Sequence, residues 1–349
     1  MHDILHRDVP SPTAPSNGRV AAAVKPLVNL MRGRPVMAVF EVCLRCNSQC
    51  GYCDLPLNVG RYEMTRDEIR RVFEGLYRDG LRYVFVQGGE PTVRRDLPAI
   101  LEDLARIGFG LCLVTNGTRL SAERVTHLAS LGVSVSVSLD TLDRGRYRRI
   151  RGADQLPRVL NGVKMLADYP HPKFITCIVS EENRADVPDV ARFARRHGFI
   201  PVLGAYHWDV GRYGKADADL QFRRQAAVAT FEEVRRRNLV PRGYYSRFLD
   251  DNIRWLKGER LARCDAGRYS IAIDASGNVA PCLAHGHAGN LREQSLSEIL
   301  AAMDHAAVRR CSDRSSCNLL CGRIVGANLR APLTALRTPM TVPPEVPPD

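Results

Sequence analysis

The 349-residue chain has no long hydrophobic run and few aromatic side chains. No stretch approaches the roughly 18–20 uninterrupted apolar residues of a membrane-spanning helix. Residues 1–20 have no apolar core after a basic region, which excludes a secretory signal peptide. Aromatic residues, 7% of the chain, do not interleave with basic ones as in a nucleic-acid-binding stripe. We therefore expect a cytoplasmic protein that spans no membrane and binds no nucleic acid.

Positive charge and cysteine are what the chain has in excess. Fifty Lys and Arg residues against 38 Asp and Glu give a formal net charge of +12. Solvated helix faces explain much of this charge, and a basic groove for an anionic substrate stays open. Eleven cysteines are an odd number, which argues against a fully paired disulfide framework. Reduced thiols are then available for metal binding or catalysis.

The middle of the chain alternates apolar runs with helical patterns, one of which starts with the capping-box residues Thr65 and Glu68. Such alternation predicts an α/β fold with a parallel sheet built from strand–helix–strand units. An open doubly wound sheet and a barrel-like sheet both fit. Six apolar runs are expected as strands, at residues 35–42, 83–86, 111–114, 133–139, 174–179 and 200–203.

Composition divides the chain into four parts. Residues 1–34 form an expected N-terminal arm with at most a short helix at 21–30, and residues 35–240 form the α/β domain. A loop-rich connection leads to a small domain within residues 241–325, with a β-hairpin at 269–281. Five of the eleven cysteines lie there, which marks the small domain as organised by metal. The proline-rich residues 326–349 are expected as an irregular tail.

The sharpest motif follows the first apolar run. Cys46, Cys50 and Cys53 have the spacing C-x3-C-x2-C, with Cys43 three residues upstream. Three thiolates on one tight loop can bind three irons of an iron–sulfur cube and leave the fourth iron open. A structural zinc ion would need four donors, usually as two separated pairs, with Cys43 as the fourth. The spacing favours the iron–sulfur interpretation.

This motif, with Tyr52 before its last cysteine, resembles that of the radical S-adenosylmethionine (radical SAM) superfamily. The resemblance covers roughly residues 36–205 and implies a partial (β/α)6 barrel, similar to a TIM barrel. It implies a 4Fe-4S cluster on the three cysteines, with S-adenosylmethionine on the open iron. One electron, from a donor such as flavodoxin or ferredoxin, then generates a 5′-deoxyadenosyl radical that abstracts a hydrogen atom from the substrate.

Further segments resemble the cofactor-contacting motifs of this family, above all the GGEP motif that ends at Pro91. Taken alone, a Gly-Gly turn or a strand-end Ser or Asn that caps a helix is an ordinary structural feature. The cofactor-binding residues that the resemblance implies are Tyr52, Gly88, Gly89, Glu90, Pro91, Asn116, Ser136, Ser138 and Arg151.

The second cysteine cluster resembles the auxiliary-cluster extension known as the SPASM or twitch domain. Two full auxiliary clusters would require about eight thiolates, and five are present, so one auxiliary 4Fe-4S cluster is expected. A zinc site on the same thiolates is the alternative. The expected ligands are Cys264, Cys282, Cys317 and Cys321, with Cys311 as a replacement.

The three remaining cysteines lie within or beside expected strands. Cys43, Cys112 and Cys177 are expected as small buried core residues. A second interpretation makes Cys112 and Cys177 barrel-facing thiols that donate a hydrogen atom to a substrate radical.

The substrate is the least determined part of the prediction. Residues 1–34 lack strand periodicity, so no leader-peptide-binding module is expected, and the basic loops at 144–151 and 206–213 favour an anionic small molecule. The leading hypothesis is oxidation, epimerisation or C–C bond formation on a sugar- or nucleoside-like metabolite, in secondary metabolism. Maturation of a ribosomal peptide is the second hypothesis. A zinc-organised module that binds nucleic acid or protein is the third.

Overall fold

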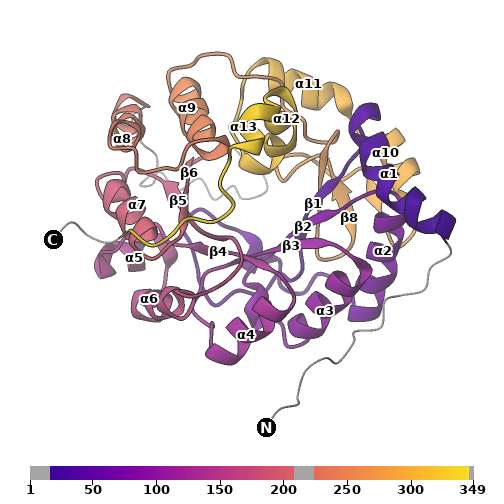
Figure 1. Ribbon diagram of the computed structural model, residues 1–349, viewed down its shortest axis with the longest axis horizontal. Helices are drawn as coiled ribbons and strands as arrows, with labels where there is room; N and C mark the ends of the chain where they lie inside the picture. Colours follow the sequence, from indigo (N-terminus) through magenta and orange to yellow (C-terminus); the bar gives the residue numbers. More distant parts are fainter. Residues whose placement is uncertain (1–15, 208–223, 346–349) are drawn as a thin grey trace, which may run out of the picture.

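The computed structural model describes residues 16–207 and 224–345, and its centre is one sheet of nine strands. The strands are β1 (Met37–Glu41), β2 (Tyr83–Gln87), β3 (Gly110–Thr115), β4 (Ser134–Ser138), β5 (Lys173–Val179), β6 (Ile200–Ala205), β7 (Ser270–Ile273), β8 (Asn278–Ala280) and β9 (Gly289–Asn290). Their order is β6-β5-β4-β3-β2-β1-β7-β8-β9, and all neighbours from β6 to β7 are parallel. The predicted α/β fold with a partial barrel is confirmed (Figure 1).

Helices surround the parallel strands on the outside of the barrel (Figure 1). The capping box predicted at Thr65 and Glu68 is confirmed at the first of them, where the Thr65 side chain accepts a hydrogen bond from the Glu68 N–H. The outer helices are α2 (Arg66–Arg78), α3 (Leu97–Ile107), α4 (Ala122–Ser130), α5 (Arg144–Arg151), α6 (Leu156–Met165), α7 (Val187–Arg196) and α8 (Arg224–Arg236).

The register of the strands separates an inner face from an outer face. Val39, Phe85, Cys112 and Ser134 are aligned across β1 to β4, so their side chains share one face of the sheet. The alternate residues, such as Phe40, belong to the large core under the helices. The face of Val39 and Phe85 instead carries a small apolar cluster, which identifies it as the barrel interior.

The C-terminal cysteine-rich segment continues the barrel sheet. Strand β7 pairs in parallel with β1, and β8 and β9 follow in antiparallel order, so the predicted hairpin is confirmed. Two helices follow, α10 (Leu296–Ala302) and α11 (His305–Asp313). The short helix η4 (Leu320–Gly322) then contacts β7. The second cysteine cluster is therefore joined to the barrel through the edge of β1.

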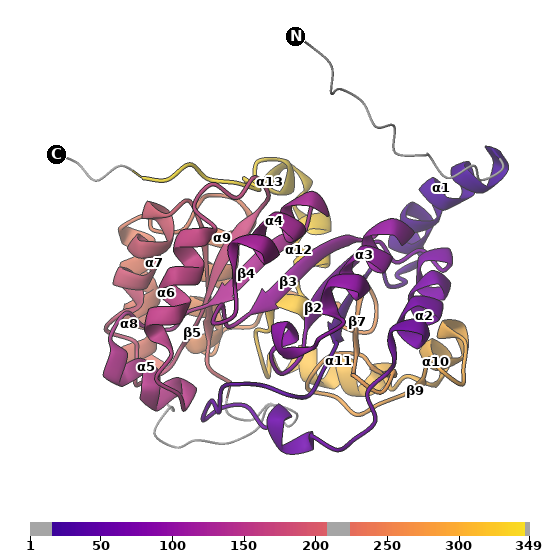
Figure 2. The ribbon, with the colours of Figure 1, turned by 90° about the horizontal axis from the view of Figure 1, so that it is seen from below.

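The short helix expected in the arm is longer than predicted, and two further expectations outside the sheet are wrong. The arm contains a 17-residue helix, α1 (Ser16–Arg32), which projects from the body (Figure 2). The expected loop-rich connection contains α9 (Tyr244–Leu256), which buries an aromatic face against α8 and β6. The expected irregular tail begins with two helices, α12 (Ile324–Arg330) and α13 (Pro332–Leu336). Proline is tolerated at the start of α13 because the first N–H groups of a helix have no partner within it.

The expected domain boundaries also cut across packing contacts. The boundary at residue 240 separates α8 from α9, which pack on each other, and the boundary at residue 325 falls inside α12. Helix α12 in turn contacts α9, so the last helices connect the β6 side of the barrel to the C-terminal segment. Across the described ranges, no helix is both long and apolar enough to cross a membrane.

Candidate radical site and auxiliary metal site

The loop after β1 is held against the two glycines that follow β2. The Gly89 N–H donates to the Cys43 carbonyl oxygen at 2.8 Å, and the Glu90 N–H donates to the Arg45 carbonyl oxygen at 2.9 Å. A Cβ atom on Gly89 would lie 2.2 Å from the Arg45 oxygen, and one on Gly88, where φ is +149°, would lie 2.4 Å from the Cys43 oxygen. Only glycine allows this approach, so the predicted Gly-Gly turn fixes the start of the cysteine loop.

The buried carboxylate of Glu90 connects the ends of β2 and β3. One oxygen accepts hydrogen bonds from the Thr92 N–H, the Thr92 hydroxyl and the Thr115 hydroxyl, at 3.1, 2.6 and 2.6 Å. The other accepts from the Asn116 N–H at 2.6 Å. Charge-assisted hydrogen bonds of this kind are stronger than neutral ones, so Glu90 fixes the position of Asn116.

Asn116 connects the end of β3 to the cysteine loop. Its side-chain amide donates to the Asn47 oxygen at 2.8 Å and to the Ser48 hydroxyl at 3.2 Å. Asn47 and Ser48 stand between Cys46 and Cys50, so the end of β3 positions the middle of the loop. Asn47 is a functional candidate that the sequence interpretation missed, because only the fold brings it to Asn116.

A buried ion pair lies on the other side of the same loop. Arg151, at the end of α5, binds Asp140 after β4 with an N–O distance of 2.7 Å, and the side chains are only 8% and 0% exposed. Burial lowers the pKa of Arg151, but the surrounding groups, with Asp140 first among them, together more than offset this, so the pKa is raised overall. Tyr52 donates to Asp140 at 3.3 Å, and a nitrogen of Arg151 lies 3.9 Å from the Cys50 sulfur.

Two polar atoms beside this ion pair have no partner in the part of the chain that the structure describes. The Arg151 Nε and the Tyr147 hydroxyl are buried and make no hydrogen bond within the described residues. Unpaired buried polar groups are rare in folded proteins and mark places where a ligand is expected. They lie next to Cys50, whose charge acts on both side chains.

The three thiols of the loop act on one another electrostatically. Burial and then the neighbouring Cys50 and Cys46 raise the pKa of Cys53 to about 12, and burial raises the pKa of Cys46 to about 11. Residues 16–207 and 224–345 contain no group of three or more His, Cys, Asp or Glu side chains already arranged as a metal site. The donor set nevertheless fits an iron–sulfur cluster, because three free thiols share one loop beside unpaired buried polar atoms.

The five C-terminal cysteines also gather in one place. The charges of Cys264 and Cys311 both act on Cys282, and burial with these neighbours raises the pKa of Cys282 to about 12. A hydrogen bond from Cys317, and then one from His285, lowers the pKa of Cys311 to about 4. The structure thus brings the four expected ligands and the expected replacement to one cluster, which His285 joins.

Asn318, between two of these cysteines, is 1% exposed, and both polar atoms of its side-chain amide lack a partner in the described chain. Nearby, the Arg323 Nε is also buried, and no described residue bonds to it. Cys321 packs against the apolar cluster inside the barrel. Free thiols around unpaired buried polar groups fit a second iron–sulfur cluster at this position.

The remaining predicted site residues occupy different faces of the sheet. Ser136 bonds to the Thr176 hydroxyl at 2.7 Å, and the register places Cys112, Ser136 and Ser138 on the inner face. Cys177 follows Thr176 on β5 and therefore lies on the outer face, in contact with the Asp140 carbonyl oxygen at 3.7 Å. Among the two expected thiol donors, Cys112 alone shares the interior face.

The segment 144–151, expected as a basic loop, is helix α5, and its arginines are largely neutralised within the protein. Its carboxylate partners come from after β4, from after α5 and from after β5, positions that the sequence alone does not bring together. Residues 208–213 of the second basic loop lie outside the described residues. The ion pairs are Arg144–Asp154, Arg146–Asp186, Arg149–Glu182 and Arg151–Asp140.

Comparisons with curated proteins show relatives of two kinds. The probable GTP 3′,8-cyclase of Pyrococcus horikoshii is 35% identical over 168 residues, which are 46% of this chain and 53% of that protein. The PqqA peptide cyclase of Bradyrhizobium diazoefficiens is 29% identical over 166 residues, which are 46% of this chain and 44% of that protein. The chain therefore spans about half the length of these relatives. The GTP 3′,8-cyclase of Erythrobacter litoralis is 30% identical over 268 residues, 71% of this chain and 79% of that protein.

Solved structures share the fold at low sequence identity. SuiB of Streptococcus suis bound to its precursor peptide SuiA matches with a TM-score of 0.64 and 16% identity, over 92% of this chain and 79% of that chain. SuiB bound to S-adenosylmethionine matches with a TM-score of 0.59 and 16% identity, over 82% of this chain and 71% of that chain.

Two family models match the two cysteine-containing parts. The radical SAM superfamily model covers residues 40–194, and the SPASM model, described as an iron–sulfur cluster-binding domain, covers residues 264–322. These matches imply a 4Fe-4S cluster with S-adenosylmethionine in the first part and auxiliary iron–sulfur binding in the second. With the Erythrobacter relative, they show that the chain belongs to the radical SAM superfamily and carries a C-terminal SPASM domain.

Proposed function

We propose that the protein forms a bond within a small nucleoside- or sugar-like metabolite by radical SAM chemistry. The observation that carries this proposal is the match to a GTP 3′,8-cyclase over 71% of this chain and 79% of the relative. C–C bond formation is thus favoured over simple oxidation or epimerisation. The neutralised arginines of α5 remove one argument for an anionic substrate, so the proposal rests on the relative rather than on charge.

Cys46, Cys50 and Cys53 are the proposed ligands of the radical-generating cluster. When bound, the cluster and S-adenosylmethionine supply hydrogen-atom abstraction. Glu90 and the two glycines before it hold the loop in place, as their contacts with residues 43–45 and 116 indicate. Arg151 presents an unpaired buried nitrogen beside Cys50, which suits a contact with a bound polar group.

The proposed auxiliary site uses four of the five C-terminal cysteines. Cys264, Cys282, Cys317 and Cys321 are the proposed ligands of one 4Fe-4S cluster. Cys311 lies within hydrogen-bonding contact of Cys317 and His285. That arrangement supports its proposed place as the replacement ligand.

An anaerobic assay tests the proposal. The reconstituted protein is incubated with S-adenosylmethionine, a reductant and a panel of nucleotides and nucleotide sugars, and 5′-deoxyadenosine and product mass are followed. We expect a member of the panel to raise 5′-deoxyadenosine release and to yield a cyclised product, and the Cys46→Ala variant to yield neither. Release that no metabolite stimulates would contradict the proposed substrate class, and release by the variant would contradict the site.

Ribosomal-peptide maturation is the second candidate. The SuiB structure with its precursor peptide and the PqqA peptide cyclase favour it, because both named proteins act on or bind peptides. Adding short peptides encoded beside the gene to the same assay separates the two, since only one substrate class should stimulate turnover. The zinc-organised binding module has no support in these matches.

A further inference from the structure

Exposed apolar side chains of the described chain gather in two places. Of the eleven large apolar side chains that are exposed there, three lie on α1 and four lie on or just after α12 and α13. The α1 stripe is Val24, Leu27 and Met31, which are 48%, 62% and 75% exposed and have the i, i+3, i+7 spacing of one helix face. The C-terminal stripe is Leu329, Leu333, Leu336 and Met340. Gathered exposed apolar side chains mark interaction surfaces.

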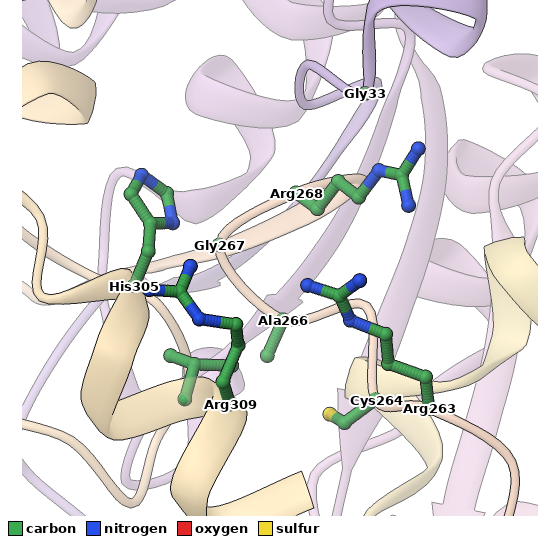
Figure 3. A pocket seen from close by; sticks show the side chains of 9 residues that line it. Gly33, Arg263, Cys264, Ala266, Gly267, Arg268, His305 and Arg309 are labelled. Carbon is green, nitrogen blue, oxygen red and sulfur yellow. The ribbon is translucent and has the colours of Figure 1, made fainter.

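The face of α1 opposite its stripe is fixed to the body of the protein. Asn29 is 2% exposed, and its side-chain amide donates to the Pro35 and Asp79 carbonyl oxygens at 3.0 and 2.8 Å. The helix ends at Gly33, where φ is +64° and a Cβ atom would lie 2.4 Å from the Nε of Arg268. Figure 3 shows the Arg268 side chain below this turn. The body therefore holds the polar face of α1 and leaves the stripe outward.

Both stripes belong to elements at the amino ends of the parallel strands. Helix α1 leads into β1. The chain after α13 reaches the start of β6, because the Glu345 N–H donates at 3.1 Å to the carbonyl oxygen of Arg195, in the last turn of α7. Figure 2 shows α1 and α13 on the same side of the molecule. The loop with Cys46 follows the carboxyl end of β1, so the radical site lies at the other end of the strands.

The chain around both stripes carries positive charge only. Residues 9–40 and residues 314–344 contain no Asp or Glu, and each of these segments has four Lys or Arg residues. Lys25, Arg32 and Arg337 are exposed, and no carboxylate within residues 16–207 and 224–345 forms an ion pair with them. The net charge of +12 has the same sign. A partner of these stripes is therefore expected to be apolar and anionic at once.

We propose that this side of the protein binds the surface of an anionic lipid membrane. An aliphatic helix face flanked by basic side chains is typical of helices that lie in a membrane interface. A second copy of the chain would bring like charges together. Stripes of three and four side chains are also few beside the roughly 20–30 residues that each partner gives to a stable protein interface.

A lipid surface, in contrast, is extended and can contact both stripes at once. Each basic residue near an anionic surface strengthens binding by roughly fivefold. Because the radical site lies at the opposite ends of the strands, it would face away from the lipid and stay open to a substrate from water. The proposal is independent of the proposed function, since it uses no residue of the radical site or of the auxiliary site.

Three double variants test the proposal by flotation of the iron-loaded protein with vesicles under anaerobic conditions. Leu27→Gln/Met31→Gln and Leu333→Gln/Leu336→Gln each remove two apolar side chains and keep the charge. The control Leu57→Gln/Val59→Gln removes two side chains that are 72% and 55% exposed beyond the carboxyl end of β1.

Vesicles of phosphatidylcholine with about 30% phosphatidylglycerol are compared with pure phosphatidylcholine, at low and high salt. We expect wild type to bind the anionic vesicles, and to bind them more weakly as salt rises. Each stripe variant should bind about tenfold more weakly and the control within about twofold of wild type. Far-ultraviolet circular dichroism and iron content should match wild type in all three variants, because the replaced side chains are exposed.

Several results would overturn the proposal. Wild type that does not float with anionic vesicles would do so, and so would equal weakening in all three variants. Salt-sensitive binding that neither stripe variant weakens would reduce the effect to charge alone. A dimer in sedimentation velocity that Leu27→Gln/Met31→Gln abolishes would assign the stripe to a second copy. Polyglutamate binding as tight as vesicle binding, and weakened by the same variants, would assign an acidic polypeptide instead.

Discussion

The buried pair of Arg151 and Asp140 should be among the most sensitive ion pairs of the described chain. Replacing Arg151 by Met keeps much of the side-chain volume but leaves the Asp140 carboxylate, which is 0% exposed, without its cation. Asp140 would retain hydrogen bonds from the Ile178 N–H at 2.8 Å and the Tyr52 hydroxyl at 3.3 Å. Breaking a buried pair by removing one partner costs about 3 to 5 kcal/mol, and we expect a loss in this range.

The same helix offers a matched control. Arg144 binds Asp154 at 2.7 Å, with side chains that are 68% and 40% exposed, so solvent screens this pair. The Arg144→Met variant should therefore unfold nearly like the wild type. The double variant Asp140→Asn/Arg151→Met removes both charges while the amide oxygen can still accept a hydrogen bond, and it should recover most of the stability lost by Arg151→Met.

Denaturant unfolding followed by far-ultraviolet circular dichroism measures these differences, under anaerobic conditions and with iron content held equal. The free energy of unfolding from each transition is compared among the four proteins. Equal losses for Arg151→Met and Arg144→Met would refute the reasoning, because burial would then make no difference. A double variant no more stable than Arg151→Met would show that the unpaired charge is not the cause.

Three further outcomes are expected. Gly89→Ala would place a Cβ atom 2.2 Å from a backbone oxygen and should cost about 1 to 3 kcal/mol of unfolding free energy and weaken S-adenosylmethionine binding, measured by titration. Gly75→Ala in α2, where an added Cβ atom would meet only the flexible Arg78 side chain at 4.0 Å, should instead be neutral or slightly stabilising. Cys46→Ala should abolish 5′-deoxyadenosine formation, with unchanged circular dichroism. Cys264→Ser should lower the iron content from about eight to about four atoms per chain, whereas Cys311→Ser should leave it near eight; the opposite result would exchange their proposed roles.

The elements that follow from local pattern were predictable from the sequence. Each of the six apolar runs coincides with a parallel strand to within two residues at either end, because buried strands of an α/β fold need continuous apolar residues. The capping box at Thr65 also marked the start of α2. Helix α5 was not expected, since its sequence RGRYRRIR offers few apolar residues, and its ion pairs with distant carboxylates contribute to its stability instead.

The candidate site was predictable in its residues and not in its contacts. The spacing of Cys46, Cys50 and Cys53 indicated a cluster loop, and the Gly-Gly-Glu sequence indicated a partner for it. Glu90 holds the end of β3 with both of its carboxylate oxygens. This contact forms because β2 and β3, which a helix separates in the sequence, lie side by side in the sheet, and no local sequence pattern predicts that. The alternation of β5 likewise places Cys177 outside the barrel, a result that requires the register with β4.

Strand β1 connects the two metal sites physically. Its carboxyl end leads into the loop of Cys46. Its edge opposite β2 pairs with β7, the strand that follows Cys264. Removing the SPASM segment would expose this edge, with unpaired N–H and C=O groups and the apolar side chains of residues 37–40, which is a template for aggregation. The radical SAM part is therefore not a complete unit without the C-terminal segment. The SPASM segment therefore contributes to the fold as well as to auxiliary iron–sulfur binding, because its strand β7 protects the edge of β1, the strand that leads into the radical-site loop.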